Sequence, residues 1–148
     1  MIEAGRNVPV EETTGFALAK ACRAHRVNVG AALAGIGLHV GQEMVLLELW
    51  KEDGLKGGEL AARLRVEPPT VTRMLQRLEG CGLVERRRDT GDARSFRVCL
   101  TKKGRALEGP VKERWGLVEE RAFRGMSEEE KALLRGQLAR IRENLDAV

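Results

Sequence analysis

The sequence predicts a mainly α-helical fold with a small β-hairpin, in which a winged helix-turn-helix lies between N- and C-terminal helices. Three observations support this prediction. Apolar residues recur at helical spacing along most of the 148 residues. A short helix and a turn lead to a Pro-Pro pair at 68–69 that opens another helix. Two short apolar segments around a charged tip follow, as in a β-hairpin.

Three helices are expected before residue 65. Residues 14–35 form a long helix, because their apolar side chains share one face. That face carries Leu18, Cys22, His25, Val29 and Leu33. Residues 41–52 form a second helix, which Asp53-Gly54 ends. Residues 58–64 form a short third helix, the first of the helix-turn-helix pair.

The fourth expected helix begins at Pro68, because proline is tolerated in a first turn whose N–H groups have no intrahelical partners. It runs to about Glu79, and its two faces differ in chemistry. The apolar face holds Val71, Met74, Leu75 and Leu78. The opposite face holds Thr70, Thr72, Arg73, Gln76 and Arg77. We therefore expect one face to be buried and the other to present hydrogen-bonding groups.

A β-hairpin is expected next, with strands at 83–86 and 95–100 around a charged tip at 88–94. Residues 85–105 carry eight basic and three acidic side chains, although the whole chain has a net charge of only +4. This local excess would suit a polyanion.

Two helices complete the expected fold. One starts at Thr101 and carries the apolar residues Leu107, Val111, Trp115 and Val118. The last starts at Ser127, where Ser127 and Glu130 form a capping box, and runs through Leu145.

The polar face of the fourth helix suggests a role in DNA binding, because such a helix has the width to enter the major groove. The side chains expected to contact DNA there are Pro69, Thr70, Thr72, Arg73, Gln76 and Arg77. Arg73 suits a bidentate contact with guanine and Gln76 a contact with adenine, with phosphate contacts open for both.

At this point the sequence resembles the MarR (multiple antibiotic resistance regulator) family over nearly the whole chain. The matching motifs are Leu60-Ala61-x-x-Leu64, Pro69-Thr70-Val71-Thr72-Arg73, Leu78-Glu79-x-x-Gly82-Leu83-Val84-Glu85-Arg86, Asp92-x-Arg94 and Leu100-Thr101-x-x-Gly104. Their joint order and spacing are more specific than any single motif.

The resemblance implies a homodimeric, ligand-responsive repressor that binds a pseudo-palindromic site in double-stranded DNA. Residues 1–40 and 106–148 would form the helical dimerisation region, and residues 41–105 the winged helix-turn-helix DNA-binding domain. The family binds small, often aromatic, effectors in a crevice, which here would draw on His39 and Trp50.

The resemblance also assigns roles in the wing. Arg94 would enter the minor groove, where negative potential is concentrated, while Asp92 helps to hold the wing tip. Arg86, Arg87 and Arg88 would contact phosphates or support the wing.

Two positions depart from the family pattern. Lys56 stands where the helix before the turn often has a Ser or Thr cap, and Glu67 stands where the recognition helix often has a Ser cap. Both helix starts therefore lack a preferred neutral capping oxygen. Glu67 also places negative charge near the DNA.

Two other functions remain alternatives. The first is a winged-helix module that binds protein partners without binding DNA. The second is a thiol-based redox-sensing regulator that uses Cys22, near Lys20 and Arg23. The usual role of cysteine as a small buried apolar residue is favoured over the sensor role.

Several function classes are not expected. The sequence offers no nucleophile–base pair, phosphate-binding loop or acidic metal cluster, so we predict neither an enzyme nor a cofactor. His25 and His39 without clustered partners make a poor zinc site. No apolar run approaches the roughly 20 residues that span a bilayer and no signal peptide is recognised, so we expect a cytoplasmic protein without a membrane partner.

Overall fold

The computed structural model describes residues 7–147. Its elements are η1 (Val10–Glu12), α1 (Thr14–Ala34), α2 (Gln42–Lys51), β1 (Leu55–Lys56), α3 (Gly57–Leu64), α4 (Pro68–Gly80), β2 (Val84–Arg88), β3 (Phe96–Leu100), α5 (Lys102–Ala106), α6 (Glu108–Ala122) and α7 (Glu128–Asp146). The parts of the predicted dimerisation region at residues 1–6 and 148 lie outside the described residues.

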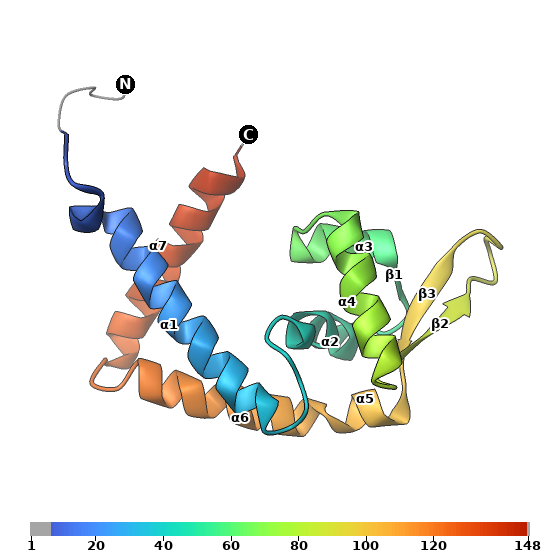
Figure 1. The fold of residues 1–148 in the computed structure, drawn as a ribbon. Helices are drawn as coiled ribbons and strands as arrows, with labels where there is room; N and C mark the ends of the chain where they lie inside the picture. The colour runs from blue at the N-terminus through green and yellow to red at the C-terminus, as the bar shows by residue number, and fades with distance from the viewer. Residues whose placement is uncertain (1–6, 148) are drawn as a thin grey trace.

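The predicted fold class is confirmed. A compact lobe contains α2 to α5 and the small sheet, and its β2–β3 hairpin projects away from the rest of the molecule (Figure 1). Helix α6 leads from this lobe to the helical arm formed by α1, α6 and α7, where α1 packs against α6. None of the described helices is long and apolar enough to cross a membrane.

The sheet has three strands where the sequence predicted two. Its order is β1-β3-β2, and both pairings are antiparallel. The additional strand β1 is only two residues long, and it pairs Leu55 with Val98 and Lys56 with Arg97. Two residues are too few to show an alternating pattern, which is why periodicity did not reveal this strand.

The helix expected after the wing is divided into α5 and α6 at Leu107. Pro110 explains the break, because it has no N–H to donate to the carbonyl oxygen of Ala106, the last residue of α5. The break lies where the lobe passes into the arm.

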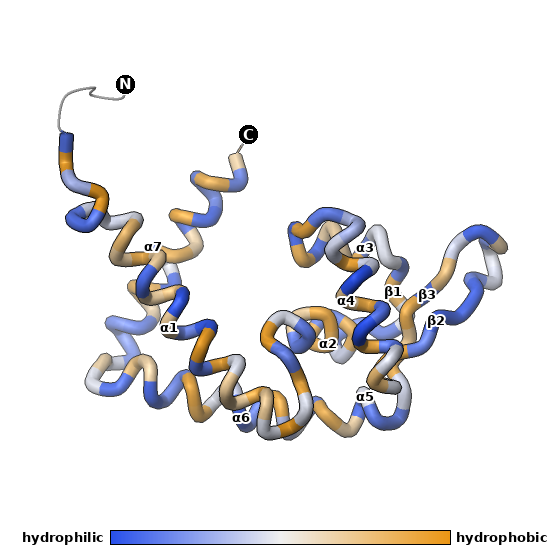
Figure 2. The backbone as a smooth tube through the Cα atoms, viewed as in Figure 1, coloured by the Kyte–Doolittle hydropathy of each residue, from blue (hydrophilic) through white to orange (hydrophobic). Residues whose placement is uncertain are grey.

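Burial is uneven between the lobe and the arm. The lobe buries the apolar residues that link α2, α3, α4 and the sheet, whereas α7 contains no buried residue among those described. Figure 2 nevertheless shows apolar segments, in orange, along α1, α6 and α7. On α7, Leu133 is 64% exposed and Leu145 is 77% exposed.

The apolar face predicted for the first helix is only partly buried. Within α1, Val29 and Leu33 are buried, and both lie in the half of the helix that is nearer α6. Cys22 is exposed, so the expectation that it is a small buried apolar residue is wrong for the single chain. The reason is that the N-terminal half of α1, which carries Cys22, buries none of its described residues against the rest of the chain.

The wing is joined to α5 by a close backbone approach at Gly104. A Cβ atom on Gly104 would lie 2.1 Å from the carbonyl oxygen of Leu83, well inside van der Waals contact. The indole N–H of Trp50 donates a 3.1 Å hydrogen bond to the carbonyl oxygen of Gly104. Glycine at this position therefore allows α2, α5 and the start of β2 to meet.

Asp53 fastens the same junction through both carboxylate oxygens. Oδ1 accepts hydrogen bonds from the backbone N–H of Leu100 at 2.8 Å and of Gly54 at 3.0 Å. Oδ2 accepts from Arg105 at 2.6 Å. The end of α2 is thus tied to the last residue of β3 and to α5.

Candidate nucleic-acid interface

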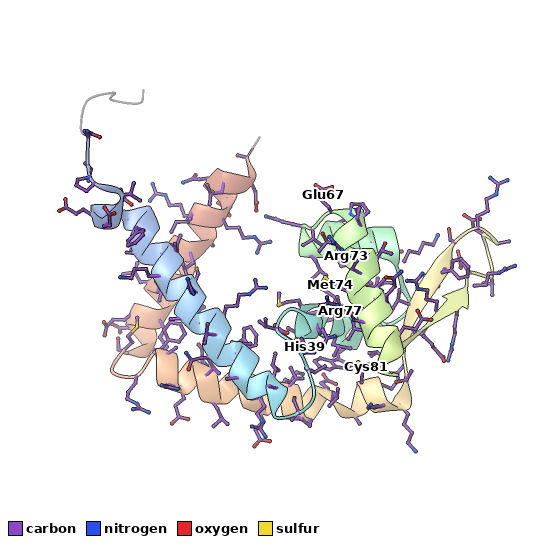
Figure 3. The ribbon with its side chains drawn as sticks, in the orientation of Figure 1. His39, Glu67, Arg73, Met74, Arg77 and Cys81 are labelled. Carbon is purple, nitrogen blue, oxygen red and sulfur yellow. The ribbon has the colours of Figure 1, made fainter. Side chains whose placement is uncertain are left out.

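Helix α4 presents the polar face that the sequence predicted. Val71, Leu75 and Leu78 are buried against the lobe. Pro69, Thr72, Arg73, Gln76 and Arg77 are exposed, and Thr70 is half-buried. Figure 3 shows Arg73 and Arg77 along this helix, with Glu67 at its start. Pro68 occupies the first helical position, and Glu67 makes no side-chain cap, in agreement with the sequence reading of this helix start.

The side chains on this face differ in how far they are committed to other groups. Within the described part of the chain, Arg73, Gln76 and Arg77 have no side-chain hydrogen bond or ion pair. Thr72 is different, because its hydroxyl donates a 3.0 Å hydrogen bond to the carbonyl oxygen of Pro68. Thr72 therefore retains a methyl group and acceptor lone pairs for any outside partner, whereas both arginines keep all their donors.

The wing tip is ordered by Asp92. Its Oδ1 accepts a 3.0 Å hydrogen bond from the backbone N–H of Arg94, and its Oδ2 accepts one of 3.0 Å from the Ser95 hydroxyl. The bond from Arg94 also lowers the pKa of Asp92 below its usual value. Arg94 itself is exposed, and its guanidinium has no ion-pair partner among the residues that the structure describes.

Most other arginines of the wing are paired with carboxylates. Arg86 lies 3.4 Å from Glu79 of α4, and Arg87 contacts Glu85 within β2. Arg97 donates to Asp89 at 2.9 Å. Arg88 has no such partner in residues 7–147. The wing arginines therefore divide into paired ones and two that are unpaired within the described residues, Arg88 and Arg94.

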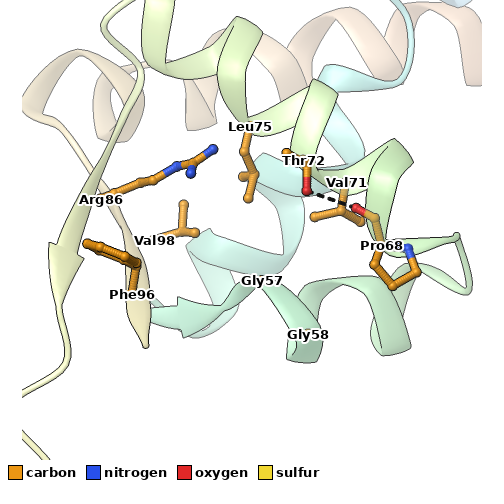
Figure 4. Close-up of a pocket in the computed structure, with 9 residues that line it drawn as sticks. All are labelled: Gly57, Gly58, Pro68, Val71, Thr72, Leu75, Arg86, Phe96 and Val98. Atoms are coloured by element: carbon orange, nitrogen blue, oxygen red, sulfur yellow. Dashed lines mark hydrogen bonds between the residues drawn. The ribbon is translucent and has the colours of Figure 1, made fainter. Parts of the chain in front are cut away.

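A pocket separates α4 from the wing, with a volume of about 210 Å³. Its wall is formed by Gly57, Gly58, Pro68, Val71, Thr72, Leu75, Arg86, Phe96 and Val98. Figure 4 shows that the Arg86 side chain extends across this pocket toward α4, and it draws the hydrogen bond between Thr72 and Pro68. A phosphate role for Arg86 stays a prediction, and it competes with the contact to Glu79.

Asp89 is a wing residue that the sequence reasoning missed. Its carboxylate accepts from Arg97 and lies 3.4 Å from the Lys56 ammonium, and the Arg97 hydrogen bond lowers its pKa below the usual value. The signal was present in the alternation of the strand, because residues 85, 87 and 89 share one face. Lys56, noted as a poor cap, therefore has an ion-pair role, while its backbone N–H donates to Glu59 at 3.3 Å.

The two residues predicted for an effector crevice, His39 and Trp50, have different surroundings in the structure. His39 is exposed in the loop between α1 and α2, and its backbone N–H donates to Gln42 at 2.9 Å. Trp50 is half-buried and bonded to Gly104. Neither lines the apolar pocket of about 250 Å³ that lies between α2 and α6.

That apolar pocket is lined by Leu47, Val111, Lys112, Trp115, Gly116 and Glu119. The ring of Trp115 also meets His25 of α1 edge-on, with 5.6 Å between centroids. The sequence reading placed Trp115 in the core, and no periodicity could show that one side of its helix borders an open space.

The cysteines and histidines form no further site in the described residues. No group of three His, Cys, Asp or Glu side chains within residues 7–147 is arranged to hold a metal ion. Cys22, Cys81 and Cys99 are free thiols, and burial raises the pKa of Cys99. A sensor role for Cys22 stays an untested alternative.

The chain is similar in sequence and in fold to known transcriptional regulators. The family model described as "MarR family" matches residues 38–96. The chain is 36% identical to the HTH-type transcriptional regulator TtmR of Methylorubrum extorquens, over 99% of this chain and 75% of that protein. It is 34% identical to the HTH-type transcriptional repressor Mb2911 of Mycobacterium bovis, over 63% of this chain and 67% of that protein. A solved MarR transcriptional regulator from Methanosarcina mazei superposes with a TM-score of 0.78 at 31% identity, over 88% of this chain and 94% of that one.

Proposed function

The chain belongs to the MarR family of transcriptional regulators, and on that premise we propose that it is a homodimeric repressor that binds operator DNA. One observation carries the proposal. On the exposed face of α4, the Arg73 and Arg77 side chains have no partner among residues 7–147, and the Arg94 guanidinium on the wing of the same lobe has none there either. A helix and a wing with unpaired guanidinium groups suit the major and minor grooves of one duplex.

The two elements divide the work in this proposal. Arg73 contacts a base edge from the middle of the exposed α4 face, with Gln76 and Arg77 beside it. Arg94 enters the adjacent minor groove, held by the turn that Asp92 makes. Arg88 contacts phosphate.

The arm supports a homodimer. Helix α7 buries none of its described residues in its own chain, although Leu133, Leu138 and Leu145 are exposed on it and Leu117 is exposed on α6. Exposed leucines in this number favour a covering partner, and a second copy of the chain offers the same apolar surface. Two lobes would then read half-sites about 10 base pairs apart in a pseudo-palindromic operator.

DNA binding is tested by selecting duplexes with the purified chain and measuring affinity by fluorescence anisotropy at several salt concentrations. Arg73→Ala is expected to cost about 1–3 kcal/mol at particular bases, because a bidentate contact is lost. Arg94→Ala is expected to weaken all sites and to lower the salt dependence of binding. Arg124→Ala, an exposed arginine on the turn after α6, is the matched control.

The competing function, a protein-interaction module, predicts a different result. Under that function Arg73→Ala and Arg94→Ala would behave like the control, and no selected duplex would be bound more tightly than random DNA. Analytical ultracentrifugation of the same preparations tests the homodimer, which Leu133→Glu is expected to dissociate.

Ligand response is the finest part of the proposal. The lining of the pocket between α2 and α6 is mostly apolar and includes Trp115, and its charged members are Lys112 and Glu119. The aromatic ring and the lysine favour an aromatic acid, whose carboxylate would compete with Glu108 for the Lys112 ammonium. Aromatic acids are expected to quench Trp115 fluorescence in a Trp50→Phe background and to release bound DNA. Quenching without any change in DNA affinity would contradict ligand-responsive repression.

A further inference from the structure

The three strands of the sheet place one cation each in a single row. Lys56 of β1 pairs in register with Arg97 of β3, and Arg97 pairs in register with Arg87 of β2. Neighbouring strands lie about 4.8 Å apart, and like charges directly opposite each other destabilise a sheet. This row therefore needs nearby negative charge to remain in place.

Two carboxylates supply that charge in different ways. Glu85 contacts Arg87, and both residues belong to β2, so this pair is local. Asp89 contacts Arg97 at 2.9 Å and Lys56 at 3.4 Å, and so it spans all three strands from the base of the wing loop. Only 9% of the Asp89 side chain is exposed, whereas the Glu85 side chain is 46% exposed.

The same cluster reaches the helix-turn-helix. Lys56 is the residue directly before α3, and Arg97 also donates a 2.9 Å hydrogen bond to the carbonyl oxygen of Gly54, in the loop after α2. On the wing side, the backbone N–H of Asp89 donates to the carbonyl oxygen of Ser95 at 2.9 Å, which closes the loop that carries Arg94. Asp89 therefore connects the base of the wing to the start of the helix-turn-helix.

We propose that Asp89 is a positioning residue for DNA binding, which fixes the wing and its Arg94 relative to α4 by bridging Lys56 and Arg97. This inference rests on the DNA-binding function proposed above. Loss of the Asp89 carboxylate leaves three adjacent cations with one local counter-charge, so the hairpin moves away from α3. Arg94 then reaches the minor groove less often, while the base contacts of α4 remain.

The test is a double-mutant cycle, measured by anisotropy on the selected operator at fixed salt. Arg94→Ala is expected to weaken binding roughly 10- to 100-fold, from the loss of charge-assisted hydrogen bonds. Asp89→Asn is expected to weaken binding about three- to thirty-fold in the wild-type background, and by less than about two-fold in the Arg94→Ala background. Glu85→Gln, which removes the local carboxylate, is the matched control and is expected to stay within about two-fold of wild type.

A second readout separates positioning from simple loss of stability. Replacing adenine by 2,6-diaminopurine under the wing adds an amino group to the minor groove and leaves the major-groove edge unchanged. Wild type should lose affinity for this duplex, and Asp89→Asn should lose less. Base discrimination by α4 should be the same in both proteins, which also shows that Asp89→Asn is folded.

Three results would overturn the inference. One is tighter binding by Asp89→Asn with a steeper salt dependence, which would mean that freed Lys56 and Arg97 bind phosphate. Another is an Asp89→Asn effect that persists unchanged in the Arg94→Ala background. The third is an equal effect of Glu85→Gln. If wild type itself bound no duplex specifically, the proposed function would fail instead, so the two failures are distinguishable.

Discussion

Gly104→Ala is expected to destabilise the chain, although alanine usually stabilises a helix relative to glycine by up to about 1 kcal/mol. The new Cβ would lie 2.1 Å from the carbonyl oxygen of Leu83, 3.1 Å from its carbonyl carbon and 3.3 Å from Cδ2 of Leu100. The first two are backbone atoms that cannot rotate away. The Leu83 carbonyl also accepts a 3.1 Å hydrogen bond from the N–H of Thr101, which a shift would strain.

The magnitude follows from these contacts. Overpacking of this kind costs about 1–3 kcal/mol, and a weakened hydrogen bond adds about 0.5–1.5 kcal/mol. The helix-propensity gain offsets part of this, so we expect a net loss of about 1–3 kcal/mol in the free energy of unfolding. Urea unfolding at a fixed chain concentration measures it, because the stability of an oligomer depends on concentration.

Gly116→Ala provides the matched control. Gly116 lies in the interior of α6, and a Cβ there would meet nothing within 4 Å. This variant is expected to gain up to about 1 kcal/mol. The steric reasoning would be refuted if Gly104→Ala were as stable as wild type, or if both variants shifted in the same direction by similar amounts.

Three further predictions concern groups that hold the lobe. Burial raises the pKa of Glu43, so the fold favours the protonated carboxyl over the charged one. The stability that Glu43 contributes is therefore fully present below the unfolded pKa of about 4.5 and is lost as pH rises through the folded pKa. The unfolding free energy of Glu43→Gln minus that of wild type should therefore increase as pH is raised above that value in chemical denaturation, and a difference that is constant with pH would contradict this. Trp50→Phe removes the indole bond to Gly104 and should cost about 0.5–1.5 kcal/mol in urea unfolding; no measurable cost would mean that the bond is not formed in solution. Asp53→Ala leaves the Leu100 N–H without its partner and should cost about 1–3 kcal/mol, with faster amide exchange at Leu100 as the site-specific signature.

Much of the fold could be predicted from the sequence, because strong local signals marked most of its elements. Pro68 fixed the start of α4, and Ser127 with Glu130 fixed the start of α7, where both capping hydrogen bonds are present. The helical spacing of the apolar residues separated the buried and exposed faces of α4. Such signals act within a few residues, so a sequence read along its length contains them.

The features that were missed depend on residues far apart in the chain. Strand β1 forms only because β3 lies beside it, and Asp89 gains its partners Lys56 and Arg97 through that pairing. The exposure of Cys22 likewise depends on what covers α1, which helical periodicity cannot show. For the candidate site, the sequence indicated which residues carry charge, and the structure shows which of those charges are already paired.

The junction at Asp53 has a consequence for how movement could pass through the molecule. Leu47 of α2 lines the pocket between α2 and α6, and Asp53 follows the end of the same helix. The Asp53 carboxylate accepts a hydrogen bond from Leu100, the last residue of β3, and so ties the C-terminal end of α2 to the sheet. A molecule that widened the pocket would therefore be expected to act on the base of the wing, through the Asp53 carboxylate and through the indole bond from Trp50 to Gly104.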